Sequence, residues 1–145
     1  PKYIMGLSTS LRYKQFTLGM SFRANIDNYV YNGMGMSTGA WETVSYNNSQ
    51  LNNLNTSFLK TGFKTRQYLS DYYVENASFL KLDNLSLSYN VGKICKWASL
   101  TVSAMVQNVF TITGYSGTDP EVPNGMDNSF YPRPRTYSLS LGFQF

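Results

Sequence analysis

The fold is decided by the stretch YIMGLSTSLRYKQFTLGMSFRANI, which runs from Tyr3 to Ile26. From Tyr3 to Tyr13 most odd-numbered residues are large and apolar, and the residues between them are mostly small or polar. After Lys14 the alternation resumes on the even-numbered residues, beginning at Phe16. Successive side chains of a strand point to opposite faces, so this pattern predicts two strands, each with one apolar face. A tight turn at Tyr13-Lys14 joins them into a hairpin.

A third strand is predicted from Ser78 to Tyr89, and its alternation changes phase partway along. Leu82 belongs to one phase and Leu85 to the other. A bulge near Asp83-Asn84 would return both halves to the same face, because a bulge adds one residue to one strand of a pair.

Two more strands are predicted toward the end of the chain. The fourth follows a short turn over residues 90–98 and runs from Leu100 to Gln107, with Met105 as an apolar exception on its polar face. In this pattern Val102 and Ser103 face opposite sides of the sheet. The fifth alternates from Tyr137 to Phe145.

Two long segments, at about residues 28–76 and 114–134, lack this alternation. The first is rich in Asn, Ser, Gly and Tyr, and the spacing of Leu51, Leu54 and Phe58 predicts a short helix around residues 49–59. The second holds most of the prolines, which predicts a turn-rich loop. Long connections therefore alternate with short ones along the chain.

Strand length and composition favour a membrane barrel over a soluble sandwich. The predicted strands approach or exceed ten residues, as spanning strands do, whereas average strands have roughly five or six. Charged residues make up only 14% of the chain, against roughly 25% in a soluble domain. The mean hydropathy is -0.30, with no apolar run long enough for a spanning helix. Five strands do not close a barrel, so further strands must come from elsewhere. Since the sequence starts at Pro1 without a signal peptide, we expect it to be a piece of a longer protein.

Four runs of sequence, in this order, resemble a known family. They are SDYYVENASFLKLDNLSLSYNV (Ser70 to Val91), QNVF (Gln107 to Phe110), YSGTDPEV (Tyr115 to Val122) and YPRPRTYSLSLGFQF (Tyr131 to Phe145). Together they are similar to the C-terminal end of the SusC/RagA family of TonB-dependent outer-membrane transporters of Bacteroidetes.

The resemblance implies an all-β fold. Residues 1–145 would supply the last five antiparallel strands of a transmembrane β-barrel of about 22 strands, an incomplete domain. The segments at about 28–76 and 114–134 would be extracellular loops. The final strand would carry the signal read by the outer-membrane assembly machinery, at Tyr137, Leu139, Leu141, Phe143 and Phe145.

The resemblance also implies a function, which is nutrient uptake across the bacterial outer membrane. The substrate would be an oligosaccharide or a peptide. Implied partners are the rest of the barrel with its plug, outer-membrane lipid, a SusD-like surface lipoprotein that acts as a lid, and TonB through the missing N-terminal part.

Aromatic residues in the two long segments are the candidate contacts to substrate or lid. Aromatic faces stack on sugar rings and on peptide side chains, and the alternative for each ring is packing within its own loop or in an interfacial girdle. The candidates are Trp41, Tyr46, Tyr72, Tyr73, Tyr115 and Tyr131.

The sequence offers no catalytic, cofactor or metal site. It has no histidine and a single cysteine, Cys95, which removes His-based triads, the usual zinc spacings and internal disulfides. The spacing of Asp119, Glu121 and Asp127 matches no calcium motif, and a turn at Asp119 is the simpler interpretation. We therefore predict that the chain is not an enzyme and needs no cofactor.

Two other functions compete with the importer. The net charge of +4 is scattered along the chain, which argues against nucleic-acid binding. A soluble β-sandwich that binds carbohydrate through exposed aromatics is the main alternative, and a small barrel formed by oligomerisation is another. The direction of the apolar faces discriminates between them. Arg23 and Asn25, on the presumed lumen face, would contact a plug, neighbouring strands or passing substrate.

Overall fold

The computed structural model describes residues 1–45, 53–95, 97–128 and 131–145, which form two compact units. The sheet unit comprises Pro1–Ile26, Phe79–Thr113 and Arg133–Phe145. The loop unit comprises Asp27–Ser78 and Gly114–Pro132.

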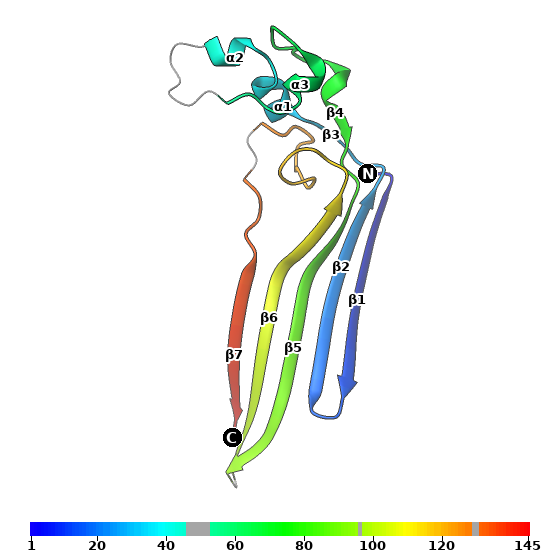
Figure 1. Ribbon diagram of the computed structural model, residues 1–145. Coiled ribbons are helices and arrows are strands. Elements are labelled where there is room, and N and C mark those ends of the chain that lie inside the picture. Colours follow the sequence, from blue (N-terminus) through cyan, green and yellow to red (C-terminus); the bar gives the residue numbers. More distant parts are fainter. Residues whose placement is uncertain (46–52, 96, 129–130) are drawn as a thin grey trace. The chain divides into compact units, whose positions relative to one another are not determined.

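The sheet unit is one antiparallel sheet of five strands in the order β1-β2-β5-β6-β7 (Figure 1). The strands are β1 (Tyr3–Tyr13), β2 (Phe16–Ile26), β5 (Phe79–Cys95), β6 (Ala98–Thr113) and β7 (Thr136–Gln144). The five predicted strands are confirmed, and each pairs with the next one of this sheet along the chain. The two ends of the chain lie at opposite ends of the sheet (Figure 1).

The predicted bulge is present where the alternation changes phase. The register of β5 against β6 shifts between Leu82 and Asn84, and the register of β2 against β5 shifts at the same place. Because of the shift, Leu82 and Leu85 come to lie on the same face despite their odd spacing.

Register gives the sheet one apolar face and one polar face along its whole width. One row of directly paired residues crosses all five strands as Leu11, Leu18, Leu87, Ala104 and Leu139. The adjacent row, on the opposite face, reads Ser10, Gly19, Ser86, Met105 and Ser138. We call these the apolar face and the polar face. Val102 pairs with Tyr89 and Leu141 on the apolar face, and Ser103 lies on the polar face, as predicted.

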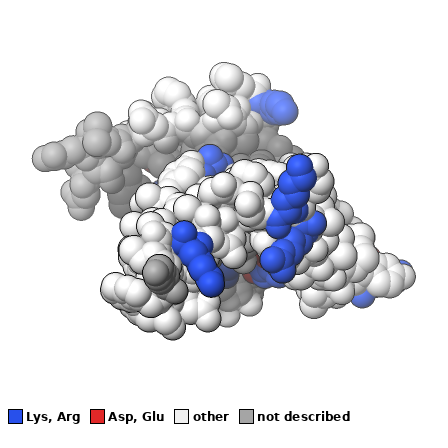
Figure 2. Space-filling model, turned by 90° about the horizontal axis from the view of Figure 1, so that it is seen from below, with Lys and Arg blue, Asp and Glu red and all other residues white. Residues whose placement is uncertain are grey.

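The apolar face is open and the polar face is tied together by side chains. On the apolar face Leu11 is 58% exposed and Leu139 is 75% exposed, although both are large and apolar. On the polar face the hydroxyl groups of Ser103 and Ser88 lie 2.8 Å apart. Seen from below the view of Figure 1, the surface is mostly uncharged and carries separate basic side chains (Figure 2). An apolar face as exposed as this one marks a surface that contacts something other than water.

The turn predicted over residues 90–98 is wrong in extent. β5 continues to Cys95 and β6 begins at Ala98. The register shifts between Asn90 and Gly92 and again between Lys93 and Cys95, so pairing continues although the regular alternation is lost. Gly92 lies at this irregularity with a φ of 88°, a backbone conformation that residues with a side chain rarely adopt.

The loop unit contains more regular structure than its sequence predicted. It holds β3 (Tyr29–Tyr31), α1 (Gly33–Thr38), α2 (Glu42–Ser45), α3 (Phe58–Thr61), the 3-10 helix η1 (Asp71–Tyr73) and β4 (Val74–Asn76), with β3 antiparallel to β4. In the part of the chain that the structure describes, no helix is long and apolar enough to cross a membrane.

The helix predicted around residues 49–59 is wrong in extent where it can be compared, since only Phe58 and Leu59 of that range are helical. Residues 49–52 lie outside the described residues, and residues 53–57 are not helical. The side chain of Asn55 accepts a hydrogen bond of 2.9 Å from the Ser57 amide, and this local turn competes with a helix. Helix α3 starts only at Phe58.

Candidate functional site

The six candidate aromatic residues fall into three groups. Tyr73 and Tyr115 are buried, whereas Trp41 and Tyr72 are about half exposed, at 52% and 51%, and Tyr131 is 84% exposed. Tyr46 lies outside the described residues. Among the five candidates that the structure describes, Trp41, Tyr72 and Tyr131 are therefore the ones accessible to a ligand.

Tyr115 has a structural role in the loop unit. It packs in a buried cluster with Val30, Ala77 and the partly buried Val122. Its hydroxyl donates a hydrogen bond of 2.9 Å to Asp127 Oδ2. Burial raises the pKa of the Tyr115 hydroxyl, and the bond to the Asp127 carboxylate raises it further, so the neutral donor is held in place.

A second polar cluster joins the two long segments of the loop unit. The Glu75 carboxylate accepts hydrogen bonds from the Asn32 side chain (2.9 Å), the Ser116 amide (2.9 Å) and the Ser116 hydroxyl (2.7 Å). Asn32 also caps α1 by accepting from the Gly35 amide at 2.7 Å. Sequence reasoning did not single out Asn32, Glu75 or Ser116, because their partners lie far apart in the chain.

Phe63 contacts Trp41 through the backbone and Tyr72 through its ring. The Trp41 amide donates to the Phe63 carbonyl at 2.9 Å, and the Phe63 and Tyr72 rings lie 5.6 Å apart in an edge-on arrangement. Tyr72 also meets Tyr73 edge-on at 5.1 Å, and Trp41 lies 6.0 Å from Phe58. Burial raises the pKa of Tyr73, with further contributions from its neighbours Tyr72 and Tyr31. Among the predicted candidates, the structure thus brings the Tyr72 and Tyr73 rings into edge-on contact.

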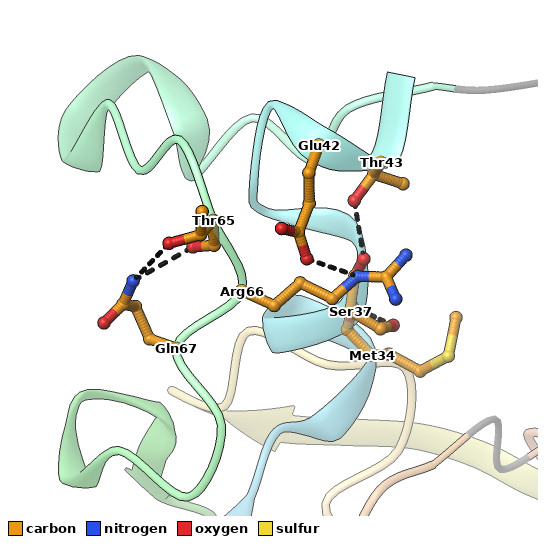
Figure 3. A network of polar contacts seen from close by, with 7 residues as sticks. All are labelled: Met34, Ser37, Glu42, Thr43, Thr65, Arg66 and Gln67. Atoms are coloured by element: carbon orange, nitrogen blue, oxygen red, sulfur yellow. Dashed lines mark hydrogen bonds and ion pairs between the residues drawn. The ribbon is translucent and has the colours of Figure 1, made fainter. Parts of the chain in front are cut away.

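The segment that carries Trp41 is fixed by polar contacts (Figure 3). Arg66 Nε lies 3.5 Å from Glu42 Oε1, and the Glu42 amide donates to the Lys64 carbonyl at 3.0 Å. On the other side of α2 the Thr43 hydroxyl donates to the Ser37 carbonyl at 2.8 Å. These bonds hold α2 to two neighbouring segments, so the Trp41 ring is presented from a fixed backbone.

Beside Tyr72 the loop unit has a hollow of about 690 Å³. Its wall is formed by residues of α1, α3, η1 and β4, by residues next to these elements and by one residue of the second long segment. The residues that line it are Asn32, Gly35, Asn55, Thr56, Ser57, Leu59, Lys60, Tyr72, Tyr73, Glu75 and Ser116.

The chemistry of this hollow suits an uncharged polar ligand. Lys60 is its cation and Glu75 its carboxylate, so the two charges of the lining cancel. The Tyr72 ring offers an aromatic face, while amide and hydroxyl groups offer donors and acceptors. The Ser57 hydroxyl oxygen is buried and has no hydrogen-bond partner among the described residues. Sugar rings and peptide backbones both match this combination.

The acidic residues of the second long segment serve the fold of the loop unit. Asp119 Oδ1 accepts from the Glu121 amide at 3.0 Å, which is the predicted turn. Asp127 is buried and engaged by Tyr115. Within residues 1–45, 53–95, 97–128 and 131–145, no three His, Cys, Asp or Glu residues come close enough to hold a metal ion.

Known proteins share both the sequence and the fold of this chain. The TonB-dependent receptor SusC of Bacteroides thetaiotaomicron is 37% identical over 98% of the chain, and the TonB-dependent receptor P3 of Formosa agariphila is 29% identical over all of it. The RagAB peptide importer in its open-open state matches 98% of the chain with a TM-score of 0.75 at 21% identity. Its closed-closed state gives a TM-score of 0.74. The aligned part makes up 15–17% of these relatives. No family model matches the chain.

Proposed function

Because the chain is homologous to a segment of the SusC/RagA TonB-dependent receptors, we propose that it forms adjacent strands of the transmembrane barrel of an outer-membrane importer. The observation that carries this proposal is the uncovered apolar face, which crosses all five strands in one register. Lipid is the cover that such a face requires, and the polar face would line the lumen.

The homology also bears on the cellular location of the protein and on whether it is an enzyme. TonB-dependent receptors are outer-membrane proteins and transporters, which confirms the predicted localisation and the prediction that the chain is not an enzyme. A soluble sandwich would bury its apolar face between two packed sheets. The described strands of the sheet unit instead form a single sheet, with Leu11 and Leu139 open.

The two edges of the sheet support the proposal of a closed barrel. β1 and β7 each have a strand neighbour on one side only. In lipid every unpaired backbone group costs several kcal/mol, so the remaining strands of a barrel of about 22 would pair with these edges. On the apolar side of β7, Tyr137, Leu139, Leu141 and Phe143, together with Phe145, would form the assembly signal.

The loop unit would lie on the extracellular side and take part in substrate capture. The solved relative is a peptide importer that works as a RagAB complex, and this supports a SusD-like lipoprotein as the partner here. The neutral hollow beside Tyr72 accommodates a peptide or an oligosaccharide. TonB and a plug would act through the rest of the polypeptide.

Arginine substitutions on the two faces of β5 test the barrel. Leu85 and Ser86 are neighbours, and Leu85 pairs with Met20 and Val106 on the apolar face. In the full-length protein Leu85→Arg should cost about 2–4 kcal/mol if it lies near the bilayer midplane, and it should lower the amount of folded barrel. Ser86→Arg on the lumen side should be tolerated.

The measurement is the amount of heat-modifiable, folded protein in purified outer membranes. Its size control is Leu85→Met, which keeps the face apolar. Equal yields of the Leu85→Arg and Ser86→Arg proteins would overturn the assignment of the apolar face to lipid.

A further inference from the structure

The charges of the sheet unit are almost all positive, which the importer function does not account for. Seven of the eight acidic residues belong to the loop unit, and the remaining one, Asp83, belongs to the sheet unit. The sheet unit holds nine of the twelve Lys and Arg residues, so its net charge is nine minus one, or +8. Asp83 is engaged by Arg23, whose Nη2 lies 2.9 Å from Asp83 Oδ1. Residues 1–26, which form the β1–β2 hairpin, contain no Asp or Glu.

Within this hairpin Lys14 occupies a turn position that a lysine does not favour. The turn between β1 and β2 consists of Lys14 and Gln15, and Lys14 has a φ of 54°. Short hairpin turns with a positive φ at their first residue favour glycine or asparagine there, because a longer side chain is strained in this conformation. The turn is also fixed, since the Asn90 amide donates a hydrogen bond of 2.9 Å to the Gln15 carbonyl. The hairpin therefore presents a cation where an uncharged residue would be less strained.

The Lys14 ammonium lies at the edge of the apolar face, beside a row of aromatic rings. It is 5.4 Å from the centre of the Tyr13 ring. Tyr13 pairs with Phe16, which pairs with Tyr89, so three neighbouring strands carry rings side by side on this face. The Phe16 and Tyr89 rings are 4.7 Å apart. A ring face attracts an ammonium group but does not neutralise its charge.

The other end of β1 carries the same pair of residue types. Lys2 Nζ lies 5.6 Å from the centre of the Tyr3 ring. At a rise of about 3.3 Å per residue and a tilt of about 40°, the strand from Tyr3 to Tyr13 spans about 25 Å along the membrane normal. This is the height of the apolar band of outer-membrane barrels. Since Lys and Tyr place their polar tips in the headgroup region, both pairs would lie at the depth of lipid headgroups.

We propose that Lys14 binds the phosphate of an anionic phospholipid at the turn end of the sheet. This inference rests on the proposed barrel, because it needs the apolar face to lie in lipid. The phosphate accepts a hydrogen bond from the Lys14 ammonium, while the acyl chains lie along the apolar face beside the rings of Tyr13 and Phe16. Figure 2, which views the protein from below Figure 1, shows basic side chains and almost no acidic ones. An anionic headgroup matches this charge, whereas a zwitterionic headgroup brings its own cation.

The test places the full-length protein in bilayer discs of phosphatidylcholine, with or without phosphatidylglycerol. Acetic anhydride modifies accessible lysine amines, and peptide mapping reports the rate at each lysine. Phosphatidylglycerol should slow the acetylation of Lys14 about fivefold, the effect expected of one lysine close to an anionic surface, because the bound phosphate shields the amine. The matched control is Lys93, which is also exposed near a turn but pairs with Ser99 on the polar face, and its rate should change much less.

Two variants locate the binding from the side of the lipid. Native mass spectrometry of the full-length protein in detergent counts the phosphatidylglycerol molecules that it retains. Lys14→Gln should lower the affinity of one bound lipid about fivefold. Arg12→Gln removes a cation from the same end of β1, where Arg12 pairs with Thr17 on the polar face, and it should leave lipid binding unchanged.

The outcomes separate this inference from the barrel itself. Equal acetylation of Lys14 in the two kinds of disc, in a protein that is still heat-modifiable, would overturn the lipid site and leave the barrel standing. Equal protection of Lys14 and Lys93 would show only a general attraction of cations to the anionic surface, and would overturn it too. Protection of Lys14 by inorganic phosphate in pure phosphatidylcholine discs would assign the site to a soluble anion instead of a lipid. A protein that forms no heat-modifiable barrel in either disc would overturn both proposals.

Discussion

At the scale of single residues, Tyr72 is the ring best placed to contact a ligand. It is half exposed, it borders the neutral hollow, and the Phe63 and Tyr73 rings hold it edge-on from two sides. A ring whose orientation is already fixed loses little conformational freedom on binding.

Tyr72→Ala should therefore weaken capture of the imported substrate by roughly fivefold, which corresponds to about 1 kcal/mol of aromatic contact. Tyr72→Phe should retain most of the affinity. Tyr68→Ala removes another exposed ring that does not line the hollow, and it should have little effect. Binding of the substrate to the purified importer measures all three, and equal losses in the Tyr72→Ala and Tyr68→Ala proteins would contradict this role for Tyr72.

The sequence located these aromatic residues in the long segments and did not separate their roles. Tyr72 and Tyr73 are neighbours in the chain, yet one is half exposed and the other buried. Tyr73 meets the Tyr31 ring and Tyr72 meets the Phe63 ring, and neither partner is a near neighbour in sequence. Local pattern carries no information about such contacts.

At the scale of elements, strands were predicted well because each one carries its own repeat. The two-residue alternation extends over nine or more residues in β1, β2 and β7, and it predicted these strands close to their observed bounds. The change of phase after Leu82 predicted the bulge. Helices α1, α2 and α3 have six residues or fewer, which is less than two turns, so no helical repeat could form. Their positions depend on caps such as Asn32 and on tertiary hydrogen bonds.

The buried hydrogen bond from Tyr115 to Asp127 leads to a prediction about alkaline pH. Burial and Asp127 raise the pKa of Tyr115, which is 10.0 for an isolated tyrosine. Since the folded state favours the neutral hydroxyl, its contribution to stability is complete below pH 10 and declines as the pH rises further. The loop unit should loosen in this range, with increased proteolysis within residues 114–128.

Tyr115→Phe should remove one late tyrosinate step from the absorbance titration, while the step of Tyr73, whose pKa burial also raises, should remain. At neutral pH it should cost the loop unit about 1–3 kcal/mol, because buried Asp127 loses a donor. Tyr131→Phe, at an exposed position, should leave the late absorbance change at its full size. A late absorbance change of undiminished size in the Tyr115→Phe protein would show that Tyr115 does not hold its proton as described.

At the scale of the whole molecule, we expect the sheet unit to have no stable form in water by itself. Its apolar face is open across five strands, and both β1 and β7 leave an edge unpaired. Exposed apolar sheet edges favour association between chains. The same properties suit a piece of a larger barrel, in which lipid covers the face and neighbouring strands cover the edges.

Expression of residues 1–145 alone should consequently give aggregated protein in the absence of detergent. Size-exclusion chromatography and circular dichroism can distinguish this from a folded monomer, with the full-length protein in detergent as the reference. A soluble monomer rich in β-structure would contradict the barrel and restore the sandwich.

The hydrogen bonds between the two long segments also set an order of events during folding. Asn32 and Ser116 are 84 residues apart in the chain, and β5 and β6 lie between them. Closing so large a loop is entropically costly and slow unless the intervening chain is already compact. The β5–β6 hairpin should therefore form first and shorten the path between Glu75 and Ser116. The loop unit then becomes a late-forming element, whose protection from hydrogen exchange would report that the β5–β6 hairpin has been completed.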